Sequence, residues 1–213
     1  AAAYRYQRIG LPFLAKLVSK VTLQDWVSPL TYYATSLLLI LIATSMAARY
    51  FAREGYNPAL ALFWSLGFGT QVTQLNGLPD GAADALLIIA LLSLVQGYRW
   101  FYAVAVTFAA LSREAYTIIP LGFMLGMALQ QLHEQRWHAF HPRALWQLIR
   151  QGYYHAIPVA IVIGWQYFLF LRFGVSASSE AAGILDWPLL QSLRYLKEGI
   201  LGHHSLVGTG IQA

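Results

Sequence analysis

The sequence contains no cysteine and few charged residues. The lack of cysteine excludes disulfide bonds and thiolate metal sites, and it leaves the redox compartment undetermined. Charged residues make up only 11% of the chain, whereas roughly 25% is usual in soluble domains. Hydrophobic residues make up 58%, and the mean hydropathy is +0.51. Because this much apolar surface needs lipid to cover it, the composition indicates an integral membrane protein.

Six stretches of the chain carry no charged residue, and they define the candidate membrane helices. A helix that spans a bilayer needs about 20 apolar residues, and the first, second and fifth stretches are long enough. The other three are short, so they must be tilted, extended by flanking polar residues or only partly inserted. We expect an all-α bundle of about six transmembrane or partly inserted helices. The stretches are residues 26–48, 55–79, 85–98, 100–112, 115–132 and 156–171.

The junction between the third and fourth stretches allows two interpretations. The two stretches could form one long helix over 85–111, with Arg99 inside it. Gly97 lies between two short apolar runs and is followed by an Arg-Trp step, which favours a tight turn instead.

We expect a single membrane domain over 1–213. An interfacial amphipathic segment occupies 1–25, the transmembrane helices occupy 26–173, and an amphipathic tail on the outer face occupies 174–213.

Three segments have the pattern of helices that lie along a membrane surface. The first begins near Pro12, a residue suited to a first helical turn. The others are 142–151 and 186–200, where Trp146 and Trp187 suit the depth of the lipid headgroups. The apolar stripes consist of Leu14, Leu17, Val18 and Val21, with Lys16 and Lys20 off that face; of Leu145, Leu148 and Ile149; and of Leu189, Leu193, Leu196 and Ile200.

The distribution of charge predicts the orientation in the membrane. Loops on one side hold Arg49, Arg53, Arg99, Arg136, Arg143 and Arg150, so the positive-inside rule places them in the cytoplasm. The opposite side then holds Asp80, Asp84, Arg113, Glu114, Glu180 and Asp186, and also the basic segment 1–25 on the membrane surface. This bias and contact with anionic membrane lipids explain the net charge of +5, so we expect no nucleic-acid partner.

Asp80 and Asp84 are the candidate catalytic residues. A helix that begins at Pro79 or Asp80 would place both carboxylates on one face near its start. Carboxylates also favour helix N-termini for structural reasons alone, so capping is the alternative. A carboxylate at the membrane boundary can act as a general base or hold a divalent cation, such as Mg²⁺ or Mn²⁺, that binds a phosphate.

Arg113 and Glu114 are the candidate substrate-binding residues, because they interrupt an otherwise apolar run. The structural alternative is an ion pair, or snorkelling, at a short turn. The functional interpretation is that Arg113 binds a phosphate, which its planar guanidinium suits. The expected topology brings the turns at 76–84 and 111–116 to the same side, and this convergence favours function.

Other motifs point to no further chemistry. His138 and His141 form HxxH and His203 precedes His204, but zinc needs three or four ligands and nothing nearby completes a set. We therefore predict no protein metal centre. Gly122 and Gly126 form GxxxG, for which chance and close helix packing are equally good explanations.

The chain resembles the membrane core of GT-C-type glycosyltransferases over about residues 4–175. The motifs that carry the resemblance are, in order, YRYQRIGLPFLAKLVS, a span begun by Asn57-Pro58, LPDGAADALLIIALLSL, and a short span that ends in ALSREAYTIIP. The resemblance implies a bacterial enzyme of the cytoplasmic membrane that uses polyprenyl-phosphate-linked sugars. It also implies an acidic role for Asp80 or Asp84 and a basic role for Arg113.

One part of the family pattern is missing from this sequence. In that family a catalytic carboxylate follows a first span, and no such span or acidic motif precedes Tyr4. We therefore expect either a fragment of a glycosyltransferase or a non-catalytic membrane subunit of a larger complex. A transporter or flippase ranks last, because the internal repeat of many transporters is not apparent.

Overall fold

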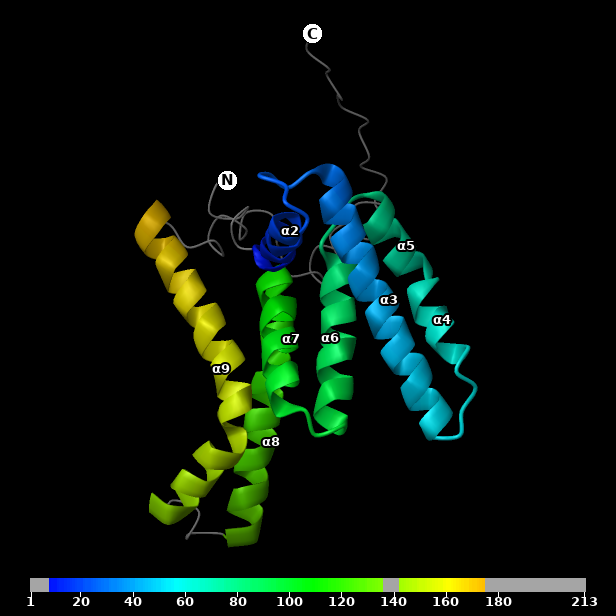
Figure 1. Cartoon of the computed structure of the whole chain (residues 1–213). Coiled ribbons are helices and arrows are strands. Elements are labelled where there is room, and N and C mark those ends of the chain that lie inside the picture. Colours follow the sequence, from blue (N-terminus) through cyan, green and yellow to red (C-terminus); the bar gives the residue numbers. More distant parts are fainter. Residues whose placement is uncertain (1–7, 136–141, 175–213) are drawn as a thin grey trace, which may run out of the picture.

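A computed structural model of the chain describes residues 8–135 and 142–174, and every regular element within these ranges is helical (Figure 1). The predicted all-α fold class is confirmed for this part of the chain. The elements are α2 (Gly10–Val21), α3 (Pro29–Arg53), α4 (Leu60–Ser65), α5 (Phe68–Leu75), α6 (Asp80–Val95), α7 (Arg99–Ser112), the 3-10 helix η1 (Glu114–Thr117), α8 (Ile118–Gln135) and α9 (Pro142–Phe173).

Three helices are long and apolar enough to cross a membrane. They cover Pro29–Arg53, Glu114–His133 and Ile149–Phe173, and Arg99–Ser112 is a shorter apolar helix. The protein is thus an integral membrane protein by the length and composition of its helices.

The second apolar stretch is not one helix, contrary to the expectation from its length. It forms α4 and α5 with a break at Leu66 and Gly67. Side chains of α5 donate to carbonyls at the end of α4: Thr70 Oγ1 donates to the Trp64 oxygen, which also accepts from the Gly67 N–H, and Gln71 Nε2 donates to the Ser65 oxygen. Both side-chain hydrogen bonds are 2.9 Å long. Such local bonds make a broken helix tolerable in an apolar environment.

The last apolar stretch is longer than expected. The segment 142–151 is not a separate interfacial helix, because it continues into α9, which runs unbroken from Pro142 to Phe173. Gly152 alone does not stop the helix, and Pro158 lies inside it. Figure 1 shows that α9 bends in its first part, so the two predicted segments are joined at an angle.

The turn between α6 and α7 is present, and the alternative of one helix over 85–111 is wrong. Gly97 has a φ of +83°, a value that glycine adopts readily. The two helices pack side by side in antiparallel directions (Figure 1). Their buried positions are rich in alanine, which allows membrane helices to approach closely. These residues include Ala82, Ala83, Ala85, Ala90, Ala103, Ala105, Ala109 and Ala110.

Helix α2 lies across the ends of the bundle helices (Figure 1). A helix was predicted here, and its location at the membrane surface stays a prediction. Its buried side chains, Leu11, Ala15 and Ser19, recur every four residues and face the bundle. The predicted apolar stripe lies on another face, where Leu17 and Val21 remain exposed. Lys20 is exposed on a third face. A helix with one face each for protein, lipid and water suits the membrane boundary.

Several predicted features lie outside the described residues. They are the positions 1–7, most of the tail over 174–213 with its helix 186–200 and Trp187, and the residues Arg136, His138, His141, Glu180, Asp186, His203 and His204.

The contact between α2 and α7 depends on Gly10. A Cβ atom at this position would lie 2.3 Å from Ser112 Oγ and 2.5 Å from the Phe108 carbonyl oxygen. Gly10→Ala should therefore lower the thermal unfolding temperature by several degrees, since overpacking costs about 1–3 kcal/mol. Gly164→Ala in α9 is the control, because a Cβ there meets nothing within 4 Å. Unfolding of Gly10→Ala at the wild-type temperature in detergent would contradict this contact.

Candidate functional site

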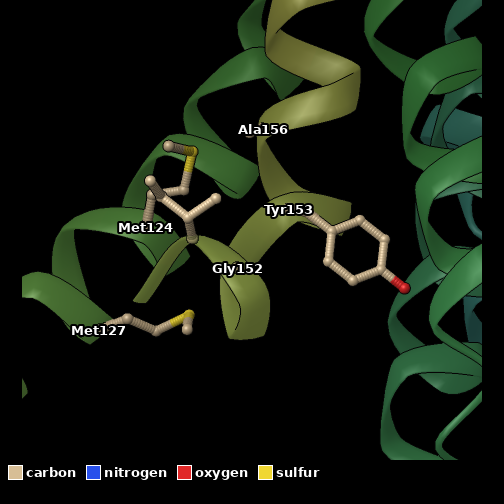
Figure 2. Close-up of a pocket in the computed structure, with 6 residues that line it drawn as sticks. Met124, Met127, Gly152, Tyr153 and Ala156 are labelled. Carbon is tan, nitrogen blue, oxygen red and sulfur yellow. The ribbon is translucent and has the colours of Figure 1, made fainter. Parts of the chain in front are cut away.

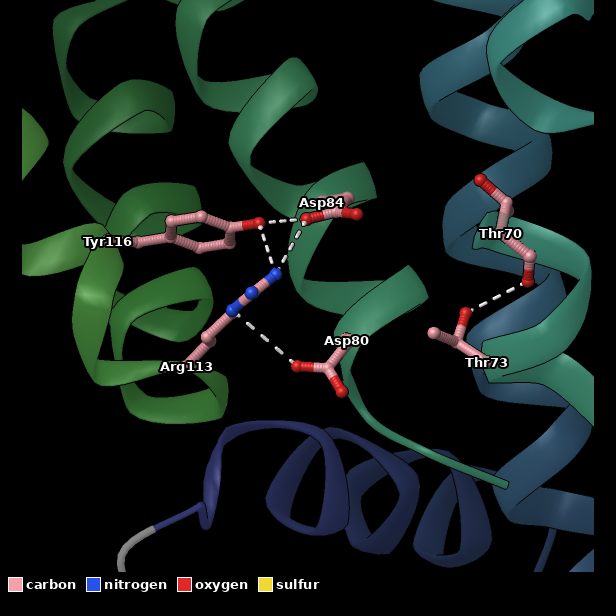
Figure 3. Close-up of polar contacts among 6 residues, drawn as sticks. All are labelled: Thr70, Thr73, Asp80, Asp84, Arg113 and Tyr116. Atoms are coloured by element: carbon pink, nitrogen blue, oxygen red, sulfur yellow. Dashed lines mark hydrogen bonds and ion pairs between the residues drawn. The ribbon is translucent and has the colours of Figure 1, made fainter. Parts of the chain in front are cut away.

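Four polar side chains meet where α6 begins and α7 ends (Figure 3). Asp80 is the first residue of α6, as predicted, and Asp84 lies one turn further along the same face. Arg113 follows α7 in an extended conformation, with φ −150° and ψ 108°, which ends that helix. Tyr116 comes from η1. The predicted convergence of the turns 76–84 and 111–116 is thus confirmed as geometry.

The guanidinium of Arg113 lies between the two carboxylates. Its Nε is 3.6 Å from Asp80 Oδ1, and its Nη1 is 3.8 Å from Asp84 Oδ1. Nη1 also donates a hydrogen bond of 3.3 Å to the Tyr116 hydroxyl, which in turn donates to Asp84 Oδ1. The guanidinium carbon lies 5.4 Å from the centre of the Tyr116 ring. One cation therefore serves two carboxylates, and these three groups together have a formal charge of −1.

The site is accessible from its surroundings. The Arg113 side chain is 43% exposed, Asp84 is 35% exposed and Asp80 is 22% exposed. Ion pairs this exposed contribute only about 0–1 kcal/mol to stability. The cluster is therefore a poor explanation of how the bundle is held together, and its side chains can rearrange around a ligand at little cost.

The structural alternatives for these residues find little support. The start of α6 has no hydrogen bond from a capping side chain, so the carboxylates are not hydrogen-bonded caps, although the helix dipole still favours them. Arg113 pairs with α6 rather than with its neighbour Glu114, whose Oε1 is buried and has no hydrogen-bond partner. Glu114 was predicted to join the cluster, but its Oε1 makes no hydrogen bond to it.

The described part of the chain has no group of three or more His, Cys, Asp or Glu side chains that could hold a metal ion. Asp80 and Asp84 supply two carboxylates. Mg²⁺ is commonly bound by one or two carboxylates together with substrate phosphates, so these two residues fit a cation that a phosphate substrate would help to hold.

Helix α5 approaches the start of α6 beside the cluster. A Cβ atom on Gly81 would lie 2.5 Å from Thr73 Oγ1, so the Thr73 side chain would have to shift if residue 81 had a side chain. Figure 3 shows Thr73 on the side of Asp80 away from Arg113. The amide of Gln74 donates to the Ser36 hydroxyl of α3. Polar groups from α3 and α5 therefore lie beside the acidic start of α6.

A second polar contact lies between α7 and α9 and was not predicted. The Tyr102 hydroxyl and His155 Nδ1 share a hydrogen bond of 2.7 Å, and the two residues are 0% and 2% exposed. The His155 ring stacks on Phe123 of α8 at 5.0 Å. The contact joins three helices, which suits a structural role in the bundle.

Three cavities in the described part of the chain are lined mainly by apolar side chains. One of about 180 Å³ lies between α8 and α9 and is lined by Met124 and Met127 of α8 and by Gly152, Tyr153 and Ala156 of α9 (Figure 2). One of about 670 Å³ separates α3 from α4 and α5. A groove of about 390 Å³ follows α7 from Trp100 to Leu111, beside α9 and the start of α2. The last α7 residue that lines this groove, Leu111, lies two residues before Arg113. Among these cavities, the groove is therefore the best placed to bind the hydrocarbon chain of a lipid.

Sequence reasoning missed Tyr116, Tyr102 and His155. Tyr116 follows Arg113 by three residues, and a 3-10 turn at this break would have placed the two side chains on one face. Nothing in the sequence signals the pairing of Tyr102 with His155, because 53 residues separate them.

Comparison with known proteins adds no identification: no family model, no curated protein and no solved structure matches this chain. The class that the fold defines is that of helical integral membrane proteins.

The Tyr102–His155 hydrogen bond can be tested by replacing one or both partners. Tyr102→Phe leaves a buried imidazole nitrogen unpaired, which should cost about 1–3 kcal/mol and lower the unfolding temperature in detergent. The double variant Tyr102→Phe/His155→Phe should lose less than the sum of the two single variants, because no polar group is stranded. Tyr167→Phe, at an exposed position, is the control. Strictly additive losses would mean that the hydrogen bond is absent.

Proposed function

We propose that this chain is a GT-C-like membrane glycosyltransferase, or part of one, that transfers a sugar from a polyprenyl-phosphate donor at the outer face of a bacterial cytoplasmic membrane. The observation that carries the proposal is the meeting of Asp80, Asp84 and Arg113 within 4 Å at one end of the bundle. The resemblance of the sequence to that family supplies the substrate class.

The cluster contains two chemical functions that such a transfer uses. A general base must accept the proton of the acceptor hydroxyl, and Asp80 or Asp84 can do so. A cationic donor must stabilise the phosphate that leaves, and the N–H groups of Arg113 match phosphate oxygens. The excess of one negative charge favours a divalent cation, which Asp80 and Asp84 would hold and which would reduce the repulsion between the carboxylates and the phosphate.

The apolar groove along α7 supports a substrate with a lipid chain. The groove follows α7 from Trp100 to Leu111. Its only polar lining groups are the Thr107 hydroxyl and the indole N–H groups of its two tryptophans. A phosphate at Arg113 would thus have an apolar path for its hydrocarbon chain nearby. The surface helix α2 contributes Ile9 and Phe13 to the upper end of this groove.

The proposal includes about six membrane segments. These are α3, the broken pair α4 and α5, α6, α7, α8 and α9, of which the short ones are tilted or partly inserted. Arg49, Arg53 and Arg99 lie at the end of the bundle away from the carboxylates, since they belong to the end of α3 and the start of α7 (Figure 1). The positive-inside rule favours the cytoplasm for that end.

Replacement of the cluster residues tests the chemistry. Asp80→Asn, Asp84→Asn and Arg113→Met should each reduce sugar transfer, and loss of the general base alone should reduce it by about 10²–10⁴-fold. Transfer is measured with the full-length protein in membranes containing a polyprenyl-phosphate sugar. Asp25→Asn, an exposed carboxylate outside the cluster, is the matched control. Normal transfer by all three cluster variants would refute the assignment.

The orientation can be measured with single cysteines, because the chain has none of its own. A cysteine at Asn76, before α6, should react with a membrane-impermeant maleimide on intact cells. A cysteine at Gln96, before α7, should react only after the cells are permeabilised. Both positions are exposed. The reverse pattern would place the cluster in the cytoplasm and contradict a reaction at the outer face.

One observation favours a second function, that of a non-catalytic subunit in a membrane complex. Helix α8 is little covered by the rest of the chain, with 6% of its apolar window buried. Gly122 and Gly126 lie exposed on it, and a Cβ at either meets nothing within 4 Å. These glycines suit close packing against a partner helix. Purification with a stoichiometric membrane partner would favour this function, and purification alone with bound polyprenyl phosphate would favour the enzyme.

A further inference from the structure

The short helix η1 presents two different polar faces. A 3-10 helix has three residues per turn, so side chains three positions apart lie on the same face. Arg113, which directly precedes η1, and Tyr116 are such a pair. Their hydrogen bond of 3.3 Å and the position of the guanidinium over the phenol ring show that they share the face directed at Asp84.

Glu114 and Thr117 form the next face by the same spacing. Both side chains are only partly exposed. Glu114 Oε1 and Thr117 Oγ1 are both buried, and neither has a hydrogen-bond partner. One face of η1 therefore has its polar groups paired with α6, while the adjacent face has a carboxylate oxygen and a hydroxyl that are both unpaired.

Unpaired buried polar atoms are rare in native proteins, and each calls for a partner. A carboxylate oxygen only accepts hydrogen bonds when ionised, and a threonine hydroxyl accepts or donates. The missing partner must therefore carry hydrogen-bond donors. Rotation about the last side-chain torsion of Glu114 is easy, so the carboxylate can turn toward a ligand at the partly exposed edge of the residue.

We infer that Glu114 and Thr117 form the subsite for the sugar hydroxyls of the lipid-linked donor. The inference rests on the proposed function, in which Arg113 binds the donor phosphate. Glu114 follows Arg113 directly in the chain, and the sugar is bonded directly to the phosphate. Groups that bind the sugar must lie near the groups that bind the phosphate, and Glu114, the first residue of η1, is the next residue after Arg113.

Binding measurements on the full-length protein in lipid nanodiscs test the subsite. The probes are undecaprenyl phosphate and a panel of its hexose and pentose esters. The wild type should bind at least one ester more tightly than the bare phosphate, by about tenfold or more, because hydrogen bonds to a charged group are strong. Thr117→Val and Glu114→Gln, which keep the shape of the side chain, should each reduce this preference and leave the affinity for the bare phosphate unchanged.

The outcomes separate this inference from the proposed function. Thr44→Val is the control, because the Thr44 hydroxyl bonds only the Ile40 carbonyl of its own helix, and it should keep the preference. If both subsite variants keep the wild-type preference, or if the wild type binds every ester no better than the phosphate, the subsite is refuted while phosphate binding stands. If the wild type does not bind undecaprenyl phosphate, or if Arg113→Met binds it equally well, the proposed function fails and the subsite fails with it.

Discussion

The close approach of α6 and α7 is the contact on which the candidate site depends. Alanines on both helices leave room for the backbones to come together, and Gly97 lets the chain reverse within three residues. Because the helices are antiparallel, the start of α6 and the end of α7 lie at the same end of the bundle. This arrangement brings carboxylates and a guanidinium together although about 30 residues separate them in the chain.

The packing of α6 against α7 positions the polar cluster, and the cluster itself does little to stabilise that packing. Its ion pairs are long and partly exposed, so they add little to stability. Most of the stability must come from packing, as in the contacts of α2 at Gly10 and of α7, α8 and α9 around His155. A cluster of charges that the fold does not need is a better candidate for function than one that replaces a core contact.

Two parts of the fold could not be predicted from apolar length. The stretch 55–79 is long enough to span a membrane, but its break at Gly67 is stabilised by hydrogen bonds from Thr70 and Gln71 that composition does not reveal. The segment 142–151 has the pattern of a surface helix, yet no stop signal separates it from the apolar stretch that follows, so both belong to α9. Local hydrogen bonds thus stabilise the break between α4 and α5, and the lack of a stop signal makes α9 one continuous helix.

The sequence by itself determined the class of protein, the helical fold, the turn at Gly97 and the identity of Asp80, Asp84 and Arg113 as residues of interest. These conclusions follow from hydropathy and residue type, which are local properties. The tertiary structure alone decided that Arg113 pairs with α6, that Tyr116 joins the cluster and that Glu114 Oε1 is buried without a hydrogen-bond partner. The physical reason is that a 3-10 turn rotates successive side chains by about 120°, so neighbours in the sequence point to different surroundings.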